Sequence, residues 1–466
     1  MSLTEEQQLG IDLVNSGKNI FITSRGAGCV KTFLLKKIID KYKITKTIAI
    51  TASTGIASVL INGVTLHSWA GIGLGNSSVE KLFTKIKSNK KKLERWKKVD
   101  ILIIDEISLI SAELFDKLEN LGRLLRENDK PFGGIQIIVC GDWLQLPNIN
   151  SSKYTFESES WNTTIDEIVY LTKIQRQKDR IFQNVLNSIR IGRITKEVKK
   201  VLRSRLNANL ENDSGIIPTE LYSLNVNVDK INKNKLENLI KKNGLQKEIF
   251  RIKWTESKKS TIKQKSIDNY FKVNSNSSNI TNNCADKNVE TNSNSSEEDD
   301  LNSIKEEIYL NCCNAVKELE LCVGAQVMLI CNLDQEQHLV NGSKGIISGF
   351  NEDNYPIVQF LNGVKMVIEN KTWEIEINNK LLGTITQIPL KLAYATSVHK
   401  SQGSTLEYVN ICLKNIFEPS QAYVGLSRVV SLEGLSIQNL DFNNFSVNLK
   451  ALEFYEKLEK NLELCV

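Results

Sequence analysis

Residues 22–32 read Ile22-Thr23-Ser24-Arg25-Gly26-Ala27-Gly28-Cys29-Val30-Lys31-Thr32, between an apolar run at 19–23 and an amphipathic stretch at 33–41. A strand, a glycine-containing turn and a helix in this order are typical of a loop that binds phosphate. The pattern G-x-x-x-x-G-K-[ST] needs glycine where the backbone wraps closely around the phosphate. Lys31, Thr32 and the middle Gly28 are present, but Arg25 and Val30 occupy the outer glycine positions. The stretch predicts a nucleotide site with a crowded phosphate loop.

Short apolar runs recur through the first third of the chain, at 19–23, 47–51, 99–104 and 135–140. They are continuously apolar, as expected for strands of a parallel sheet that is covered on both faces. Helical patterns separate these runs. The sequence therefore predicts a doubly wound α/β domain.

The composition is that of a soluble globular protein, with 41% hydrophobic and 24% charged residues. A chain of 466 residues is too long for one core, so two to four domains are expected. No apolar run is long enough to span a bilayer and the first residues are no signal peptide, which favours an intracellular protein without a membrane partner. The net charge of +6 is compatible with a polyanionic partner but carries little weight.

Cysteine and histidine usage argues against a zinc site. The chain has nine cysteines and three histidines, and no two cysteines follow the C-x-x-C spacing of zinc ligands. We expect a reducing compartment and no disulfide framework.

Two carboxylates, Asp105 and Glu106, directly follow the apolar run at 99–104. The carboxyl end of a parallel strand lies at the crevice where such sheets bind ligands. Asp105 is therefore a candidate ligand of Mg²⁺, and Glu106 a candidate base that orients and deprotonates the attacking water. A solvated acidic turn is the alternative, which Lys31-Thr32 upstream makes the weaker of the two.

Three further side chains complete the predicted catalytic set. Gln145, in Gly141-Asp142-Trp143-Leu144-Gln145-Leu146-Pro147, could sense the γ-phosphate, although a Gly-Asp turn also explains this segment. Arg176 and Arg428 lie far apart in the sequence. If two α/β units face each other across a nucleotide, these arginines would neutralise charge in the transition state, an effect of roughly 10³–10⁵ in rate. Either arginine alone is better explained by a surface salt bridge, but the pair together with the carboxylates is not.

Two segments combine hydroxyls, backbone donors and an aromatic residue, the mixture that binds single-stranded nucleic acid. They span 51–69 and 393–405, and their candidate DNA contacts are Thr54, His67, His399 and Lys400. A dense basic cluster lies within a small arm at about 72–98 and consists of Lys81, Lys85, Lys87, Lys90, Lys91, Lys92, Arg95, Lys97 and Lys98. This cluster is either a solvated helix face or an arm that contacts duplex DNA.

The second half of the chain carries two insertions. The segment 255–305 is rich in Asn, Ser and Lys, which predicts a disordered linker. Within it, Gln264, Ile267, Tyr270 and Phe271 form the pattern Q-x-x-I-x-x-Y-F, in which one helical turn would gather the apolar side chains as a plug for a pocket. Replication proteins that bind the sliding clamp resemble one another in this pattern, and chance is the rival explanation. The segment 306–385 reads as short strands separated by turns such as Asn341-Gly342 and Asn362-Gly363, which predicts a small β-barrel.

Taken in order, these segments resemble the Pif-type 5′→3′ DNA helicases of superfamily 1B. The resemblance rests on Leu3-Thr4-Glu5-Glu6-Gln7, 51–57, 104–108, Gly141-Asp142 with Gln145-Leu146-Pro147, Arg176-Gln177, 324–328 with 340–342, 399–403 and 426–428. It implies two RecA-like P-loop NTPase domains, at 1–168 and at 169–254 with 386–466, and an inserted SH3-like barrel at 306–385.

The resemblance also implies ligands and roles. ATP with Mg²⁺ would lie between the motors, held by Gly26, Ala27, Gly28, Lys31, Thr32 and Gly403, with Thr32 and Asp105 at the metal. Gln7 would read the adenine edge, although Thr4 and Gln7 also fit a capping box. The partners would be single-stranded DNA and duplex junctions, and the protein a monomer. The implied roles are DNA repair, recombination, replication or telomere maintenance, in a nucleus, mitochondrion or viral replication site.

The phosphate loop departs from the family pattern at Arg25 and Val30, and one residue is added before it. A side chain at position 30 crowds the phosphate, and a positive φ there would add roughly 1–3 kcal/mol of strain. We expect a helicase with weak-to-moderate ATPase activity. The alternatives are a DNA-binding adaptor without ATPase activity that the clamp recruits, and a motor that moves on RNA.

Overall fold

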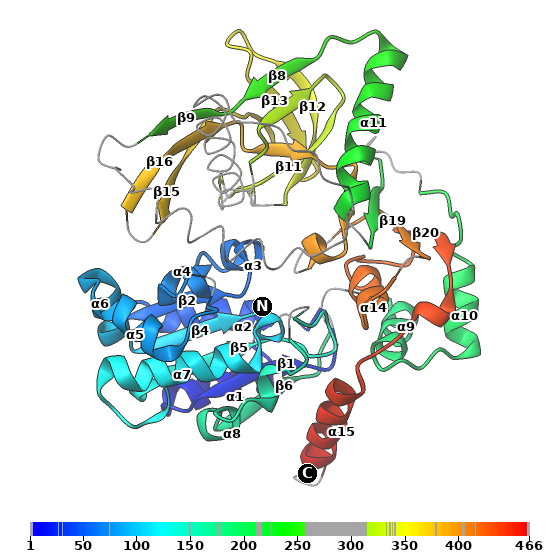
Figure 1. Ribbon diagram of the computed structural model, residues 1–466. Coiled ribbons are helices and arrows are strands. Elements are labelled where there is room, and N and C mark those ends of the chain that lie inside the picture. Colours follow the sequence, from blue (N-terminus) through cyan, green and yellow to red (C-terminus); the bar gives the residue numbers. More distant parts are fainter. Residues whose placement is uncertain are drawn as a thin grey trace, which may run out of the picture.

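The computed structural model places most of the chain in two parallel sheets and an antiparallel insertion (Figure 1). The structure describes residues 3–26, 28–29, 31–73, 75–148, 151–174, 177, 179–210, 217–223, 225–256, 315–331, 333–334, 337, 339, 342–377, 380–402, 406–414 and 416–463. The predicted clamp-binding residues 264–271 lie outside this part of the chain.

The first domain is built on a six-stranded sheet in the order β3-β2-β4-β5-β1-β6, and every neighbouring pair is parallel. Its strands are β1 (Ile20–Ser24), β2 (Ile48–Ala52), β3 (Val64–Thr65), β4 (Ile101–Asp105), β5 (Gln136–Cys140) and β6 (Glu167–Leu171). The four apolar runs of the sequence correspond to β1, β2, β4 and β5. The boundary expected at 168–169 falls inside β6, which pairs with β1.

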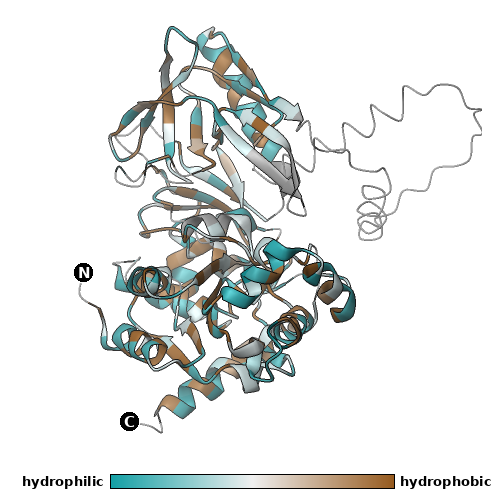
Figure 2. Ribbon diagram, turned by 90° about the vertical axis from the view of Figure 1, so that its left-hand side faces the viewer, coloured by the Kyte–Doolittle hydropathy of each residue, from teal (hydrophilic) through white to brown (hydrophobic). Residues whose placement is uncertain are grey.

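Two apolar cores cover the two faces of this sheet, as the continuously apolar strands predict. On one face, Ile20, Ile22, Ile101 and Ile103 pack under α1 (Glu5–Asn15) and α2 (Lys31–Tyr42). On the other face, Phe21, Leu102 and Ile104 pack under residues of α4 (Leu66–Ala70), α5 (Val79–Lys87), α6 (Lys90–Lys98) and α7 (Ala112–Arg126). Figure 2 shows helices in the lower part of the molecule, near both termini, that carry teal and brown stretches side by side, as expected where one side of a helix is buried.

The second domain has a four-stranded parallel sheet in the order β18-β7-β19-β20. Its strands are β7 (Thr219–Tyr222), β18 (Ala395–Ser397), β19 (Val409–Leu413) and β20 (Leu435–Leu440). The helices α9 (Arg180–Arg190), α10 (Lys196–Arg203) and α14 (Gln421–Leu426) contribute to its core, which includes Phe182, Leu202 and Tyr423.

The insertion follows α11 (Asn225–Asn243) and consists of antiparallel strands. A five-stranded sheet has the order β14-β13-β12-β11-β17, with β11 (Gln326–Leu329), β12 (Lys344–Phe350), β13 (Pro356–Phe360), β14 (Lys365–Val367) and β17 (Leu390–Leu392). A three-stranded sheet and a two-stranded pair join β9 (Lys253–Glu256) to β15 (Lys371–Ile377) and β16 (Lys380–Gln387), and β8 (Glu248–Arg251) to β10 (Glu318–Leu321). The likeness to an SH3 barrel stays a prediction.

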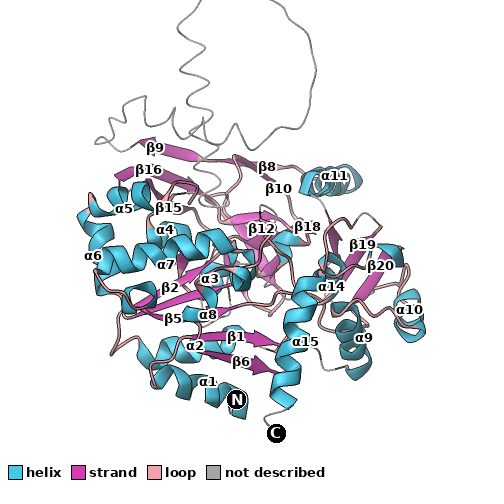
Figure 3. Ribbon diagram, turned by 60° about the horizontal axis from the view of Figure 1, so that its bottom comes forward, coloured by secondary structure: helices cyan, strands magenta, loops and turns pink. Residues whose placement is uncertain are grey.

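The last helix, α15 (Leu449–Glu463), packs on the first domain although it follows the second domain in the sequence. Ala451 and Tyr455 belong to the same core as Phe21 and Trp143. Figures 1 and 3 both show α15 beside β1 and β6, with α9 on its other side. The predicted range 386–466 had placed this helix in the second domain. Among the described residues, no helix is both long and apolar enough to cross a lipid bilayer.

Candidate active site

The lysine of the phosphate loop points back over the end of strand β1. Lys31 is the first residue of α2, and its Nζ donates to Ser24 Oγ at 3.2 Å. Ser24 Oγ in turn donates to the carbonyl of Gly26 at 3.0 Å, and Gly28 has φ of +94°. A cation therefore stands beside the N-terminus of a helix, where unpaired N–H groups also favour an anion. Thr32 lies half-buried in the first turn of α2, while Ala27 and Val30 lie outside the described residues.

Helices of the second domain lie close to this loop. A Cβ on Gly26 would be 3.1 Å from Asn187 Oδ1 of α9 and 3.9 Å from the Tyr423 hydroxyl of α14. Arg25 points outward, 63% exposed, and its Nε lies 3.9 Å from Glu459 Oε1 of α15. The residue that replaces the first family glycine is thus directed away from the loop and towards the last helix.

The carboxylates Asp105 and Glu106 stand at the end of β4. Asp105 is buried, and its Oδ1 accepts the backbone N–H of Glu106 at 2.9 Å. Burial, with the neighbouring Glu106 carboxylate as the next cause, raises the pKa of Asp105 to about 7. Glu106 has φ of +52°, an uncommon conformation for a residue with a side chain.

The donors around Asp105 suit a small divalent cation. Ser53 donates its backbone N–H to the carbonyl of Asp105 at 3.1 Å, and its buried hydroxyl has no hydrogen-bond partner among the described residues. The buried Ser108 hydroxyl, in the 3₁₀ turn η1 (Ile107–Leu109), is also unpartnered in the described part of the chain. These hydroxyls lie on segments that flank Asp105 in the sheet or in the sequence, and a bound Mg²⁺ with its waters would supply partners for such groups.

Glu106 is contacted by the second domain. Gln402 Nε2 donates to Glu106 Oε2 at 3.1 Å, across 296 residues of sequence. Gln402 follows the 3₁₀ turn η5 (His399–Ser401) in a segment predicted to bind nucleic acid. Gly403, a predicted nucleotide contact, lies outside the described residues. One hydrogen bond therefore links the predicted catalytic base to the predicted DNA-binding segment.

Gln145 is buried and its amide Nε2 donates to Asp142 Oδ2 at 3.3 Å. Asp142 is fully buried at the end of β5, and its Oδ1 accepts an N–H of Arg190 at 2.9 Å. Burial acts to raise the pKa of Asp142, but Arg190 and Lys31 outweigh it and hold that pKa below its usual value. The sensor candidate is thus tied to an ionised carboxylate.

Arg190, the last residue of α9, is the residue that sequence analysis missed. It is only 3% exposed, and besides Asp142 its Nη2 donates to the carbonyl of Ser24 at 3.0 Å. Its guanidinium carbon lies 4.5 Å from the ring centroid of Tyr455. The available signal was weak: Arg190 follows Leu186 by four residues on the buried stripe of an amphipathic helix, where a charge is unusual.

Arg428 is buried against α14. Its Nε donates to the carbonyl of Val424 at 2.9 Å and its Nη2 to Ser427 Oγ at 2.8 Å. These bonds hold the guanidinium near its own helix, and its role at a nucleotide stays a prediction. Arg176 lies outside the described residues.

Gln7 forms the capping box that its spacing from Thr4 allows. Its Oε1 accepts the N–H of Thr4 at 3.1 Å, and Thr4 Oγ1 accepts the N–H of Gln7 at 3.3 Å. The structural interpretation of this pair is confirmed, and adenine recognition by Gln7 stays a prediction.

The four candidate DNA contacts have mixed surroundings. Thr54 Oγ1 accepts the N–H of Ala57 at the start of α3 (Gly55–Leu60), and His399 Nε2 lies 2.8 Å from Glu418 Oε2. His67 is half-buried, and burial lowers its pKa. Lys400 is exposed. Lys400 is therefore the most available of the four for a phosphate.

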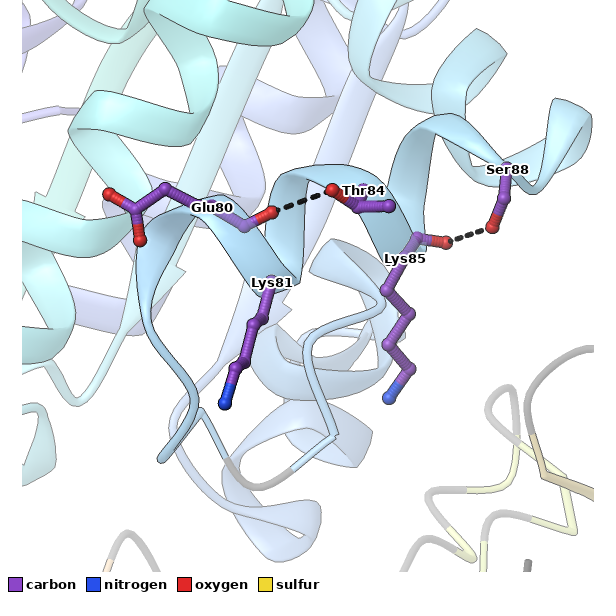
Figure 4. A pocket seen from close by; sticks show the side chains of 5 residues that line it. All are labelled: Glu80, Lys81, Thr84, Lys85 and Ser88. Atoms are coloured by element: carbon purple, nitrogen blue, oxygen red, sulfur yellow. Dashed lines mark hydrogen bonds between the residues drawn. The ribbon is translucent and has the colours of Figure 1, made fainter.

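The basic arm consists of α5 and α6. Figure 4 shows Lys81 and Lys85 of α5 pointing to the same side, along a surface hollow that Glu80, Thr84 and Ser88 also line. Lys92, by contrast, is buried over Gly71. Part of the cluster is thus structural, and Lys81 and Lys85 of α5 present an exposed cationic face.

Comparison with known proteins identifies the family. The family PIF1-like helicase matches residues 2–200, and the domain family DNA helicase Pif1, 2B domain matches residues 301–350. The crystal structure of Pif1 helicase from Candida albicans is 34% identical with a TM-score of 0.78, covering 98% of this chain and 100% of that one. The chain belongs to the PIF1-like helicase family. Its two parallel-sheet domains are therefore of the RecA-like α/β type, as expected.

Other PIF1-like relatives are longer than this chain. The ATP-dependent DNA helicase PIF1 of Danio rerio is 38% identical over 98% of this chain but only 64% of its own length. For the human PIF1 the values are 35%, 99% and 65%. An uncharacterised protein of Invertebrate iridescent virus 6 is 34% identical over 98% of this chain and 94% of its own length. The chain thus spans about two thirds of the animal PIF1 helicases that it matches.

Proposed function

We propose that this chain is an ATP-driven DNA helicase that moves 5′→3′ on single-stranded DNA and unwinds duplex or structured DNA. The observation that carries the proposal is the gathering of Lys31, Asp105 and Glu106 at the C-terminal edge of one sheet, with Gln402 of the second domain on Glu106. A Pif1 structure in complex with ADP-AlF3 and single-stranded DNA is 28% identical, covers 99% of this chain and has a TM-score of 0.66. These similarities support the same ligands for this chain.

The residues divide the ATPase chemistry among them. Lys31, with Gly26, Ala27 and Gly28, binds the phosphates, while Gln7 and Gly403 contact the rest of the nucleotide. Thr32 and Asp105 hold Mg²⁺, which supplies positive charge on the phosphate oxygens. Glu106 accepts a proton from the attacking water, Gln145 senses the γ-phosphate, and Arg176 and Arg428 approach from the second domain as charge develops. Closing the domains completes the site, and opening them releases the products.

Single-stranded DNA runs past Thr54, His67, His399 and Lys400 in this proposal, with α5 of the basic arm near the duplex. A strand-displacement assay tests it. Duplexes with a 5′ single-stranded tail are unwound with ATP, whereas matched duplexes with a 3′ tail are not. Unwinding of the 3′-tailed substrate alone contradicts the polarity, and stimulation of the ATPase by RNA but not by DNA would favour an RNA motor.

The altered phosphate loop sets the expected rate. We expect DNA-stimulated ATP hydrolysis that rises when the crowding residue is removed by Val30→Gly, because the backbone can then follow the phosphates. Arg25→Gly is the matched control, since the Arg25 side chain points to Glu459 and away from the loop. A glycine variant without any gain in rate shows that position 30 does not limit turnover.

The second candidate is a DNA-binding adaptor without ATPase activity, recruited by a sliding clamp. The motif of Gln264, Ile267, Tyr270 and Phe271 favours it, and it also fits the active helicase. Titration of a peptide covering 264–271 against purified clamp tests the contact, with Tyr270→Ala as control. The absence of binding at high micromolar peptide rejects clamp recruitment. We further propose a role in repair, recombination, replication or telomere maintenance, at a nuclear, mitochondrial or viral site, which membership of the family supports.

A further inference from the structure

One buried network joins the phosphate loop, the sensor segment, the second domain and the last helix. Arg190 of α9 donates to Asp142 Oδ1 and to the Ser24 carbonyl. Ser24 receives Lys31 through its hydroxyl, so the arginine and the phosphate-loop lysine contact the same residue. Asp142 also accepts Gln145 Nε2. Lys31 and Gln145, two residues of the proposed nucleotide site, are therefore each joined to Arg190 through one shared partner, Ser24 or Asp142.

Tyr455 of α15 closes the network on the other side of the arginine. Its ring lies against the guanidinium, and its hydroxyl lies 2.6 Å from Thr23 Oγ1 and accepts the N–H of Trp143 at 3.2 Å. Arg190, Tyr455, Asp142 and Ser24 are each no more than 3% exposed. A buried guanidinium with both a carboxylate and a carbonyl acceptor has little freedom to change its place without breaking strong bonds.

We propose that Arg190 is a positioning residue that couples the nucleotide site to the second motor domain. A shift of the phosphate loop or of Asp142 moves the C-terminal end of α9, because the guanidinium holds both. Asn187, one turn earlier on α9, already faces Gly26, so the helix follows the loop at two points. This inference rests on the proposed function and names the residue through which ATP state reaches the DNA-binding half.

The coupling can be measured without turnover, as the factor by which a non-hydrolysable ATP analogue changes the Kd for single-stranded DNA. In the unaltered protein we expect a factor of at least about 5. Arg190→Met with Asp142→Asn removes the pair without leaving a buried charge, which keeps the fold stable. In this double variant the factor falls to within about twofold of one, while each ligand binds alone nearly as before.

A second variant and a control separate coupling from simple packing. Arg190→Lys keeps the charge but loses the fork that reaches Asp142 and Ser24 together, and it lowers the factor as well. Arg180→Met, at the exposed start of the same helix, leaves it unchanged. If the Arg190–Asp142 pair only stabilises the fold, the stably folded double variant should keep the coupling factor of the unaltered protein.

The outcomes discriminate between the two proposals. Coupling within twofold of the unaltered protein in either folded Arg190 variant overturns the role of Arg190, and so does an unaltered protein whose factor is one. If the unaltered protein does not hydrolyse ATP but shows the expected coupling factor, the proposed motor function is contradicted and the role of Arg190 stands.

Discussion

Lys344 is a buried amine at the contact between the insertion and the second domain. It lies on β12, and its Nζ donates to Thr219 Oγ1 on β7. Burial lowers its pKa from 10.5 to about 7, and the Glu407 carboxylate opposes this shift. The unfolded chain therefore binds more protons than the folded chain between about pH 7 and pH 10.5, so stability should rise with pH over that window.

Lys344→Met should accordingly stabilise the protein, and more so at low pH. The gain in Tm is largest near pH 6.5, where the unaltered protein must bury a charged amine, and it shrinks towards pH 10. Each unit of pKa shift corresponds to about 1.4 kcal/mol. Thermal unfolding at a series of pH values measures it. Lys365→Met on the exposed β14 serves as control and should show no such trend. An equal gain at every pH would mean that Lys344 is already charged in the folded protein.

At the scale of elements, one close contact of α7 in the first domain depends on a glycine. Gly122 lies within α7 where the 3₁₀ segment η2 (Pro131–Gly134) crosses it, and a Cβ there would be 2.6 Å from the backbone carbon of Phe132. Gly122→Ala forces α7 away from η2 and should lower the free energy of unfolding by about 1–3 kcal/mol.

Urea denaturation measures this loss. Gly55→Ala is the matched control, since Gly55 is also helical and a Cβ there would have nothing within 4 Å. The control should be neutral or slightly stabilising, as alanine is the better helix former. Equal effects of the two substitutions would show that the α7–η2 contact yields without strain.

Elements with a strong local pattern could be predicted from the sequence, and those defined by distant partners could not. The strands β1, β2, β4 and β5 are continuous apolar runs, and they place Asp105 and Glu106 at the sheet edge as expected. The two-residue β3 is too short to leave a pattern. The expected boundary at 168–169 cuts through β6, because only the pairing with β1 reveals that the whole strand belongs to the first sheet.

The candidate site shows the same division. Asp142 was visible within a motif, but its partner Arg190 is 48 residues away on a helix whose pattern is that of an ordinary amphipathic segment. The hydrogen bond between Gln402 and Glu106 spans 296 residues. No local rule relates such pairs, because their proximity arises only when the two domains pack together.

At the scale of the whole molecule, this hydrogen bond reports how the domains close. Gln402→Glu places a second carboxylate beside Glu106, and the repulsion should open the two domains. We expect a larger radius of gyration at pH 8 and low salt, measured by small-angle X-ray scattering. Gln402→Met removes the hydrogen bond without adding charge and should change the radius much less. Equal radii for both variants would show that other contacts hold the domains together.

The return of α15 to the first domain has a mechanical consequence. The chain crosses to the second domain after β6, which ends at Leu171, and crosses back before α15, which begins at Leu449. A domain that is attached by two chain connections can rotate about the line that joins them, but it resists rotation about other axes. In the proposed motor, each cycle of ATP binding and product release would therefore move the second domain along a single arc.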